Sequence, residues 1–288
     1  MIDKGKNNLN RTKIYLIGSF LPFRDKIISA LPGYSFSDPR THPQSCVQKL
    51  VAADMSEAEN CPAALAVFPR GKRKGVMSFA ELGASAAHQN HILVVDETGE
   101  DDTLLEHIAS KSFGNIESVI EYLRTEPFLS SHTQNEILKK YPPTAEDKPI
   151  PVKNIYFCGT IDDKMLQTID KARKMRPDKN MIVKSDPVNE FHNINDYDLI
   201  VVNFPGEIDW DRHACFMMGA AYSHDLPVLL REDKDWRYPP LQALVRRHTP
   251  TLEGVLEYVT EVDDMHINRE AVNMYYFFER ELKRRNTK

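Results

Sequence analysis

Two stretches of the sequence decide the fold: Ile14-Tyr15-Leu16-Ile17-Gly18-Ser19 and Ile155-Tyr156-Phe157-Cys158-Gly159-Thr160. Each is a short apolar run, rich in β-branched and aromatic residues, that ends in a glycine and a hydroxyl residue. This pattern predicts a buried strand that leads into a tight turn. Its recurrence in the second half of the chain indicates an internal repeat.

The similarity between the two halves continues beyond these strands. From Phe68 and Phe204 onward the offset is constant at 136 (204 − 68). This offset pairs Gly83-Ala84 with Gly219-Ala220, His88 with His224, and Glu121-Tyr122 with Glu257-Tyr258. A single offset over such a length indicates that the chain contains a tandem duplication of one unit.

Each copy is predicted to alternate strands with helices. In the first copy, apolar runs predict strands at 14–18, 64–68 and 91–95, and helical periodicity covers 46–60, 79–89 and 115–124. Such alternation is typical of a mostly parallel sheet with helices on both faces. We therefore predict an α/β fold of two tandem Rossmann-like or flavodoxin-like units, whose ligands bind at the carboxyl ends of the strands.

The expected organisation has four parts. Residues 13–127 form the first copy, 153–262 the second, and 263–288 a C-terminal helix whose aromatic stripe is expected to pack in the core. Residues 128–152, which are rich in proline and polar residues, are expected to be a linker.

Composition excludes several classes of protein. A net charge of −5 in 288 residues argues against a general nucleic-acid surface. The four cysteines form no C-x-x-C pair and no zinc-like cluster with histidine, so we expect reduced thiols, no metal and no cofactor. No run of 18 apolar residues suggests a membrane span, and the start has no signal-peptide core, so a cytoplasmic protein is expected.

The most informative stretch is a basic loop, residues 70–75, that leads into Ser78-Phe79-Ala80-Glu81-Leu82-Gly83. The loop is predicted to be solvated or to close over a phosphate. Ser78 and Glu81 have the spacing of a capping box, which is one interpretation. The other places Glu81 in a pocket. The second copy has alanine and methionine at these two positions, so the fold does not demand Glu81. In that copy Asp211 is predicted to cap the helix.

These motifs resemble the nucleoside 2-deoxyribosyltransferase family and its nucleotide N-hydrolase relatives. The resemblance covers residues 13–125 and rests on four elements in the family's order: Ile14 to Ser19, Asp38-Pro39-Arg40, Asp54 before a strand, and Ser78 to Gly83 with Ala87. It implies cleavage or transfer at an N-glycosidic bond of a nucleoside or nucleoside 5′-monophosphate through a covalent glycosyl-glutamate intermediate.

The resemblance also implies roles for individual residues. Glu81 would be the nucleophile, Asp54 would protonate or position the base, and Tyr15 would orient the nucleophile. The substrate site would be lined by Gly18, Ser19, Asp38, Arg40 and Ser78. Each has a structural alternative: Tyr15 as a buried strand aromatic, Asp54 as a solvated helix residue, and Arg40 as a solvated turn residue instead of a phosphate ligand.

Two departures weaken the case for base exchange: Gly75 and Pro62 stand where the family has aspartates. With the basic loop, the absent aspartate at Gly75 favours a nucleotide hydrolase slightly. Glu190 is not counted as a counterpart of Asp54, because the offset of 136 does not yet hold at Asp186. A small nucleoside or nucleotide is the expected partner, and a homo-oligomer is left open, with the second copy as an internal pseudo-subunit.

Two other functions remain open: an NAD-type glycohydrolase and a non-catalytic nucleotide-binding sensor. A Rossmann dehydrogenase and a Walker-type triphosphatase are disfavoured because their glycine-rich motifs are absent. A phosphoribohydrolase of the lysine-decarboxylase-like type is disfavoured because its P-G-G-x-G-T run is absent.

Overall fold

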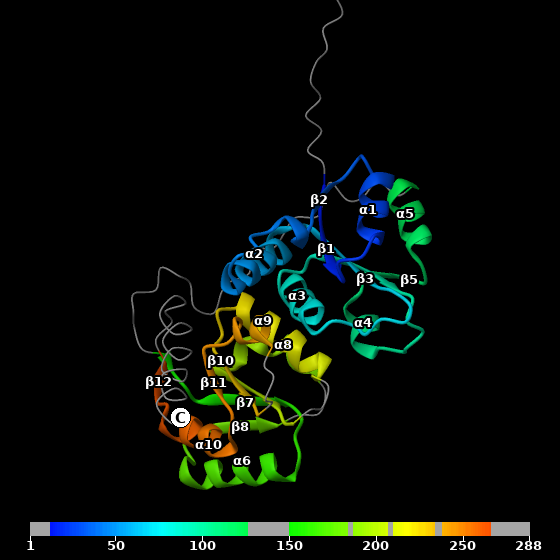
Figure 1. Ribbon diagram of the computed structural model, residues 1–288. Helices are drawn as coiled ribbons and strands as arrows, with labels where there is room; N and C mark the ends of the chain where they lie inside the picture. Colours follow the sequence, from blue (N-terminus) through cyan, green and yellow to red (C-terminus); the bar gives the residue numbers. More distant parts are fainter. Residues whose placement is uncertain (1–11, 126–149, 184–186, 207–209, 234–237, 266–288) are drawn as a thin grey trace, which may run out of the picture.

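The computed structural model describes residues 12–125, 150–183, 187–206, 210–233 and 238–265. Within these ranges the chain forms two five-stranded sheets, ordered β2-β1-β3-β4-β5 and β8-β7-β9-β10-β11 (Figure 1). All neighbouring strands in both sheets are parallel. The two orders are the same when each copy is numbered from its own first strand, and they match the flavodoxin-like arrangement. The predicted fold class is confirmed.

Strand register confirms the duplication. Tyr15 pairs with Ala64 and Tyr156 pairs with Ile200, and the two partners are again 136 residues apart (200 − 64). The strands of the first sheet are β1 (Lys13–Gly18), β2 (Ser35–Ser37), β3 (Ala63–Phe68), β4 (His91–Asp96) and β5 (Lys111–Phe113). Those of the second sheet are β7 (Asn154–Gly159), β8 (Asn180–Val183), β9 (Leu199–Phe204), β10 (Val228–Glu232) and β11 (Arg247–Thr249).

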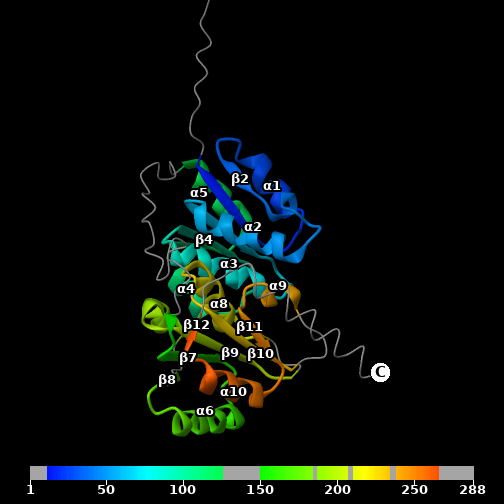
Figure 2. The ribbon, with the colours of Figure 1, turned by 90° about the vertical axis from the view of Figure 1, so that its left-hand side faces the viewer.

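Helices form three layers around the two sheets (Figures 1 and 2). The outer face of the first sheet is covered by α1 (Phe23–Ala30) and α5 (Ile116–Thr125), and that of the second by α6 (Asp163–Met175) and α10 (Leu252–Glu261). The remaining helices are α2 (Val47–Asn60), α3 (Val76–Ala87), α4 (Thr103–Ile108), α7 (Pro187–His192), α8 (Arg212–Ser223) and α9 (Pro239–Gln242), with the 3-10 turns η1 (Pro39–Thr41) and η2 (Ile194–Asp196).

The two copies pack through α3 and α8, which cross closely because each carries a glycine at the contact. A Cβ on Gly83 would lie 2.0 Å from the carbonyl oxygen of Phe216, and a Cβ on Gly219 would lie 1.8 Å from that of Ala80. The contact is reciprocal, because Gly219 is the counterpart of Gly83 and Phe216 is the counterpart of Ala80 at the offset of 136. The copies therefore meet like the subunits of a twofold-symmetric dimer, and one buried apolar cluster contains residues of both.

The predicted linker and the predicted C-terminal helix lie mostly outside the described residues. Residues 128–149 of the predicted linker (128–152) and 266–288 of the predicted C-terminal helix (263–288), including its aromatic stripe, lie outside the described residues. The last linker residues form β6 (Ile150–Pro151), which pairs antiparallel with β12 (Asp264–Met265). All four cysteines are free thiols, and three are buried. In the described ranges we find no helix with the length and apolar character that crossing a membrane requires.

Candidate functional site

Glu81 is a buried carboxyl group in the second turn of α3. The helix begins at Val76 with Gly75 at its N-cap and no side-chain cap, so Ser78 and Glu81 do not form the capping box. The Glu81 residue is 6% exposed. Burial, reinforced by the nearby charge of Asp54, raises its pKa to about 8, against an opposing effect from Arg24 and the Tyr15 hydroxyl. The negative charge of Glu81 is therefore unfavourable in this position, and its side chain does not cap the helix.

Two tyrosines, one from each copy, lie near enough to this carboxyl group for its charge to act on them. Tyr15 of β1 is fully buried, and burial, followed by the charges of Glu81 and Asp54, raises the pKa of its hydroxyl. That hydroxyl has no partner at good hydrogen-bond geometry. Tyr238, which precedes α9 in the second copy, also has a raised pKa because of burial and the charge of Glu81. The second copy therefore borders the site of the first.

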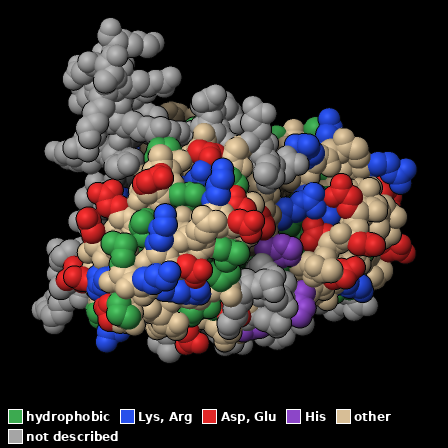
Figure 3. Space-filling model, turned by 90° about the horizontal axis from the view of Figure 1, so that it is seen from below, with side chains coloured by type: hydrophobic (Ala, Val, Ile, Leu, Met, Phe, Trp, Pro, Cys, Tyr) green, Lys and Arg blue, Asp and Glu red, His purple; other side chains and the backbone are tan. Residues whose placement is uncertain are grey.

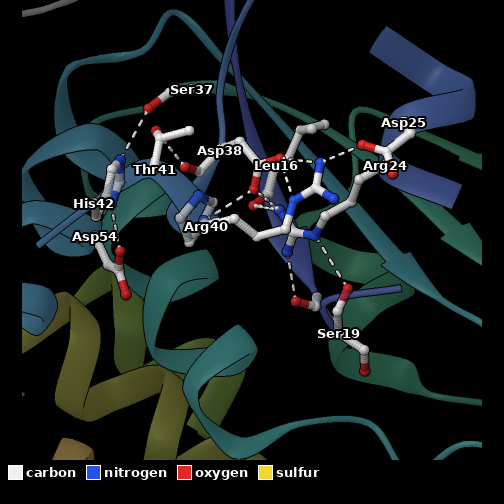
Figure 4. Close-up of polar contacts among 12 residues, drawn as sticks. Leu16, Ser19, Arg24, Asp25, Ser37, Asp38, Arg40, Thr41, His42 and Asp54 are labelled. Atoms are coloured by element: carbon white, nitrogen blue, oxygen red, sulfur yellow. Dashed lines mark hydrogen bonds and ion pairs between the residues drawn. The ribbon is translucent and has the colours of Figure 1, made fainter. Parts of the chain in front are cut away.

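Asp54 forms a pair with His42, a residue that the sequence did not single out. The Nδ1 atom of His42 lies 2.5 Å from Oδ1 of Asp54, and its Nε2 atom lies 3.4 Å from the Ser37 hydroxyl (Figure 4). The imidazole is parallel to the Tyr15 ring, with centroids 6.4 Å apart. Burial raises the pKa of Asp54, and the hydrogen bond with His42 opposes that shift. Asp54 is buried and not a solvated helix residue.

A network of arginines and aspartates closes the end of β1 (Figure 4). Arg24, fully buried in the first turn of α1, donates to the carbonyl oxygens of Leu16, Gly18 and Ser19 and to Asp38 at 3.0 Å. Burial lowers the pKa of Arg24, and the charges of Asp38 and Glu81 oppose this. Arg24 is the cation that acts on Glu81, and the sequence analysis missed it.

Arg40 is held by two carboxylates. Its Nε donates to Asp38 at 2.8 Å, and its terminal nitrogen lies 2.7 Å from Asp25. Burial would raise the pKa of Asp38, but the hydrogen bonds from Arg40 and the charge of Arg24 lower it overall. The Arg40 side chain is one-third exposed. A phosphate would have to share this guanidinium with the two aspartates, and the phosphate role remains a prediction.

The other predicted site residues lie around this cluster. Gly18 has a φ of 120°, and a Cβ there would lie 2.4 Å from the carbonyl oxygen of Val67, so packing against β3 requires glycine. The Ser19 carbonyl accepts from Arg24. Ser78 is buried, and its backbone N–H donates to the Gly75 carbonyl. The substrate contacts predicted for these three residues remain predictions.

The basic loop before α3 ends in a structural lysine. The Lys74 side chain is completely buried, 2.6 Å from Asp96 and 3.4 Å from Asp102. Asp102 also pairs with Arg212 of the second copy at 3.2 Å. Lys74 is therefore not solvated, because its charge pairs with two aspartates of its own copy, one of which also pairs with the second copy.

The second copy keeps much of this arrangement. Tyr156 is fully buried like Tyr15, and the charge of Glu190 contributes to the raised pKa of Tyr156, as Asp54 does for Tyr15. Glu190 thus lies near Tyr156 in the second copy, as Asp54 lies near Tyr15 in the first. It accepts a hydrogen bond from Tyr197. Met217, fully buried, replaces Glu81.

The described residues contain no cluster of three His, Cys, Asp or Glu side chains that could hold a metal ion. The chemical groups that do converge are a buried carboxyl, a carboxylate–imidazole pair and tyrosine hydroxyls. These groups can attack an electrophilic carbon and transfer protons.

Comparisons with known proteins give no family. No family model matches the chain, and no curated protein matches it. One similar solved structure is a putative UDP-N-acetylglucosamine 2-epimerase from Listeria monocytogenes, 11% identical, covering 95% of this chain and 88% of the other, with a TM-score of 0.25. A similarity this low supports no conclusion about activity.

The expected membership of the nucleoside 2-deoxyribosyltransferase family is therefore wrong, since no model of that family matches. The structure gives a physical reason for the misleading motifs. Gly18 is required by its contact with β3, and Gly83 by the contact of α3 with α8. Both motifs therefore contain residues that packing explains without reference to any activity.

Proposed function

We propose that this protein cleaves the N-glycosidic bond of a nucleoside or nucleoside 5′-monophosphate, with Glu81 as the nucleophile. One observation carries the proposal: a buried carboxyl group with a pKa raised to about 8, at a position where the duplicate helix has methionine. Strongly shifted ionisable groups concentrate at functional sites, because folding alone selects against them.

The chemistry suits a carboxylate in this environment. A Glu81 oxygen would bond to C1′ of the sugar as the C1′–N bond breaks, and the bonding electrons would leave with the base. Water would then attack C1′, releasing the sugar and regenerating Glu81. Positive charge develops on the sugar in both transition states. A desolvated carboxylate is stabilised most when such charge forms beside it.

The leaving base needs a proton, and the Asp54–His42 pair is suited to supply one. The two groups are 2.5 Å apart, so they can exchange a proton between them and pass it to a ring nitrogen of the departing base. The same pair would then take a proton from the attacking water.

The raised pKa of Glu81 predicts the pH dependence of the reaction. Only the ionised carboxylate can attack, and most of the free enzyme is protonated at neutral pH if the pKa is about 8. We expect kcat/KM to rise with pH up to about that value and then level off. A general acid at this position would give the opposite profile, with activity falling above about 8.

A substrate panel tests the proposal. Deoxynucleosides, ribonucleosides, their 5′-monophosphates and NAD are each incubated with the protein, with and without a free acceptor base, and released base is quantified by chromatography. We expect release from at least one, and a loss of at least about 10⁴-fold in Glu81→Gln. Base exchange on adding the acceptor would indicate transfer. Release from NAD alone would support an NAD-type glycohydrolase.

Binding of one compound without base release would contradict the proposal and favour a nucleotide sensor. His213→Ala is the control for preparation and folding, because this partly exposed histidine lies on α8, outside the cluster around Glu81. Its activity is expected to equal that of the unmodified protein.

A further inference from the structure

A cavity lies between the two copies. It has a volume of about 460 Å³ and is lined by residues of α3, α4 and β4 from the first copy and of α7, η2 and α8 from the second. None of the residues described above around Glu81 lines it. The volume falls within the range of about 300–1,000 Å³ typical of small-molecule sites. We refer to this space as the inter-copy cleft.

The cleft exists because the two copies differ in one helix. The pseudo-twofold relation pairs α2 with α7 and α4 with α9, since these helices occupy the same places in the strand order. In one half of the interface the 14-residue α2 contacts α9. In the other half α7 has only six residues and ends at His192, so the equivalent space next to α4 stays open.

Apolar and polar side chains line the inter-copy cleft in similar measure. Phe191 and Phe216 meet edge to face, with centroids 5.2 Å apart, and Ile108 faces them as another lining residue. His107 of α4 and His192 of α7 come from opposite copies, and their ring centroids are 6.5 Å apart. Figure 3 shows histidine side chains gathered at the seam between the two halves.

The lining determines what kind of molecule would fit. No Lys, Arg, Asp or Glu lines the inter-copy cleft, so it has no permanently charged side chain to pair with a strongly charged ligand. Aromatic and imidazole rings favour a flat, π-rich partner. The side-chain amide of Asn195 provides donors and an acceptor that could pair with ring nitrogens and exocyclic groups.

We propose that the inter-copy cleft is a second ligand site, which binds an uncharged, planar heteroaromatic compound of nucleobase or nucleoside size. The site is separate from Glu81, and the proposal does not depend on the proposed reaction. Because both copies contribute to its walls, a bound ligand would also hold the two halves together.

Calorimetric titration with adenine, cytosine and adenosine tests this proposal. The informative variant is His107→Ala/His192→Ala, since both histidines are exposed and their loss should leave the fold intact. Ile108→Trp is a second variant, which fills the space without touching the histidines. We expect binding of at least one probe, weakened at least tenfold in both variants and unchanged in Glu81→Gln and in the control His213→Ala.

Three results would overturn the proposal. The first is no binding of any probe. The second is equal affinity in the unmodified protein and the double histidine variant, which would place the probe elsewhere. The third is binding that is abolished in Glu81→Gln and retained in the double histidine variant, because the probe would then occupy the site around Glu81. In that last case the proposed reaction would stand and the second site would not.

Discussion

Helices α3 and α8 are equivalent elements of the two copies. They differ in their N-cap residues and at one buried position, and both sequences form the same helix. Each has 12 residues and ends at a histidine whose backbone N–H bonds to the preceding turn. Asp211 caps α8, as predicted, through a hydrogen bond to the Ala214 N–H, whereas Gly75 gives α3 no such cap. Glu81 of α3 corresponds to Met217 of α8, and both are buried.

This difference separates structural residues from functional ones. The buried tyrosine of the first strand and the neighbouring carboxylate, Asp54 or Glu190, occur in both copies, so their presence alone does not mark the active half. A buried methionine satisfies the helix packing at no electrostatic cost. The first copy keeps a carboxyl group there in spite of that cost, and this contrast is why we propose Glu81 as the nucleophile.

The largest expected effect is on the pH dependence of stability in Glu81→Met. The folded-state pKa of Glu81, about 8, lies above the ordinary value of 4.5, so the folded state holds a proton that the unfolded chain releases between these values. Stability should therefore fall as pH rises from about 4.5 to 8, by at most about 5 kcal/mol. The variant should lose this dependence and be more stable at pH 9 in urea unfolding.

Met217→Glu is the matched variant in the second copy. It puts a carboxyl group at the equivalent buried position and should introduce a new loss of stability with rising pH. If Glu81→Met is no more stable than the unmodified protein at pH 9, Glu81 is not held in an unfavourable charged state, and the contrast between the two helices would lose its energetic basis.

A smaller effect is expected from Asp54→Asn. This change keeps the size of the side chain but removes the carboxylate that pairs with His42, so proton transfer to the base should slow by about 10²- to 10³-fold in kcat/KM. Glu190→Gln, the corresponding change in the second copy, should leave kcat/KM unchanged. Equal losses in both variants would show that the two carboxylates act through the fold.

The smallest effect, and a symmetric one, is expected at the glycines of the interface. Gly83→Ala and Gly219→Ala each bring a methyl group against backbone of the other copy, so each should lower the free energy of unfolding by about 1–3 kcal/mol. Urea unfolding measures both. A clear loss in one variant and none in the other would contradict the pseudo-twofold packing.

The sequence predicted the parts of the fold that local patterns encode. The central strands and the helices α2, α3 and α5 follow from apolar runs and helical periodicity, and the duplication follows from the constant offset. Of the two interpretations of Ser78 and Glu81, the capping box is not formed, because the helix begins two residues before Ser78. The short strand β2 was not predicted, since three residues give too little pattern.

Half of the candidate site depends on contacts between distant residues. Arg24 gives no local signal that it will reach the end of β1 and Asp38, and His42 meets Asp54 only because η1 packs beside α2. The charge of Glu81 acts on Tyr238 across the interface between the copies. Comparison of the two copies nevertheless identified Glu81. That comparison does not depend on local pattern, because it asks which residue, Glu81 or Met217, stands at the same position of the same fold.

Trapping the covalent intermediate tests the role of Glu81 most directly. The protein is mixed with its substrate bearing fluorine at C2 of the sugar, which slows breakdown of a glycosyl-enzyme by destabilising the positive transition state, and the digested protein is mapped by mass spectrometry. We predict a glycosyl adduct on the peptide that contains Glu81, located on that residue and absent in Glu81→Gln. Release of base from this substrate with no adduct, or with an adduct on another residue, would contradict the assignment of Glu81 as the nucleophile.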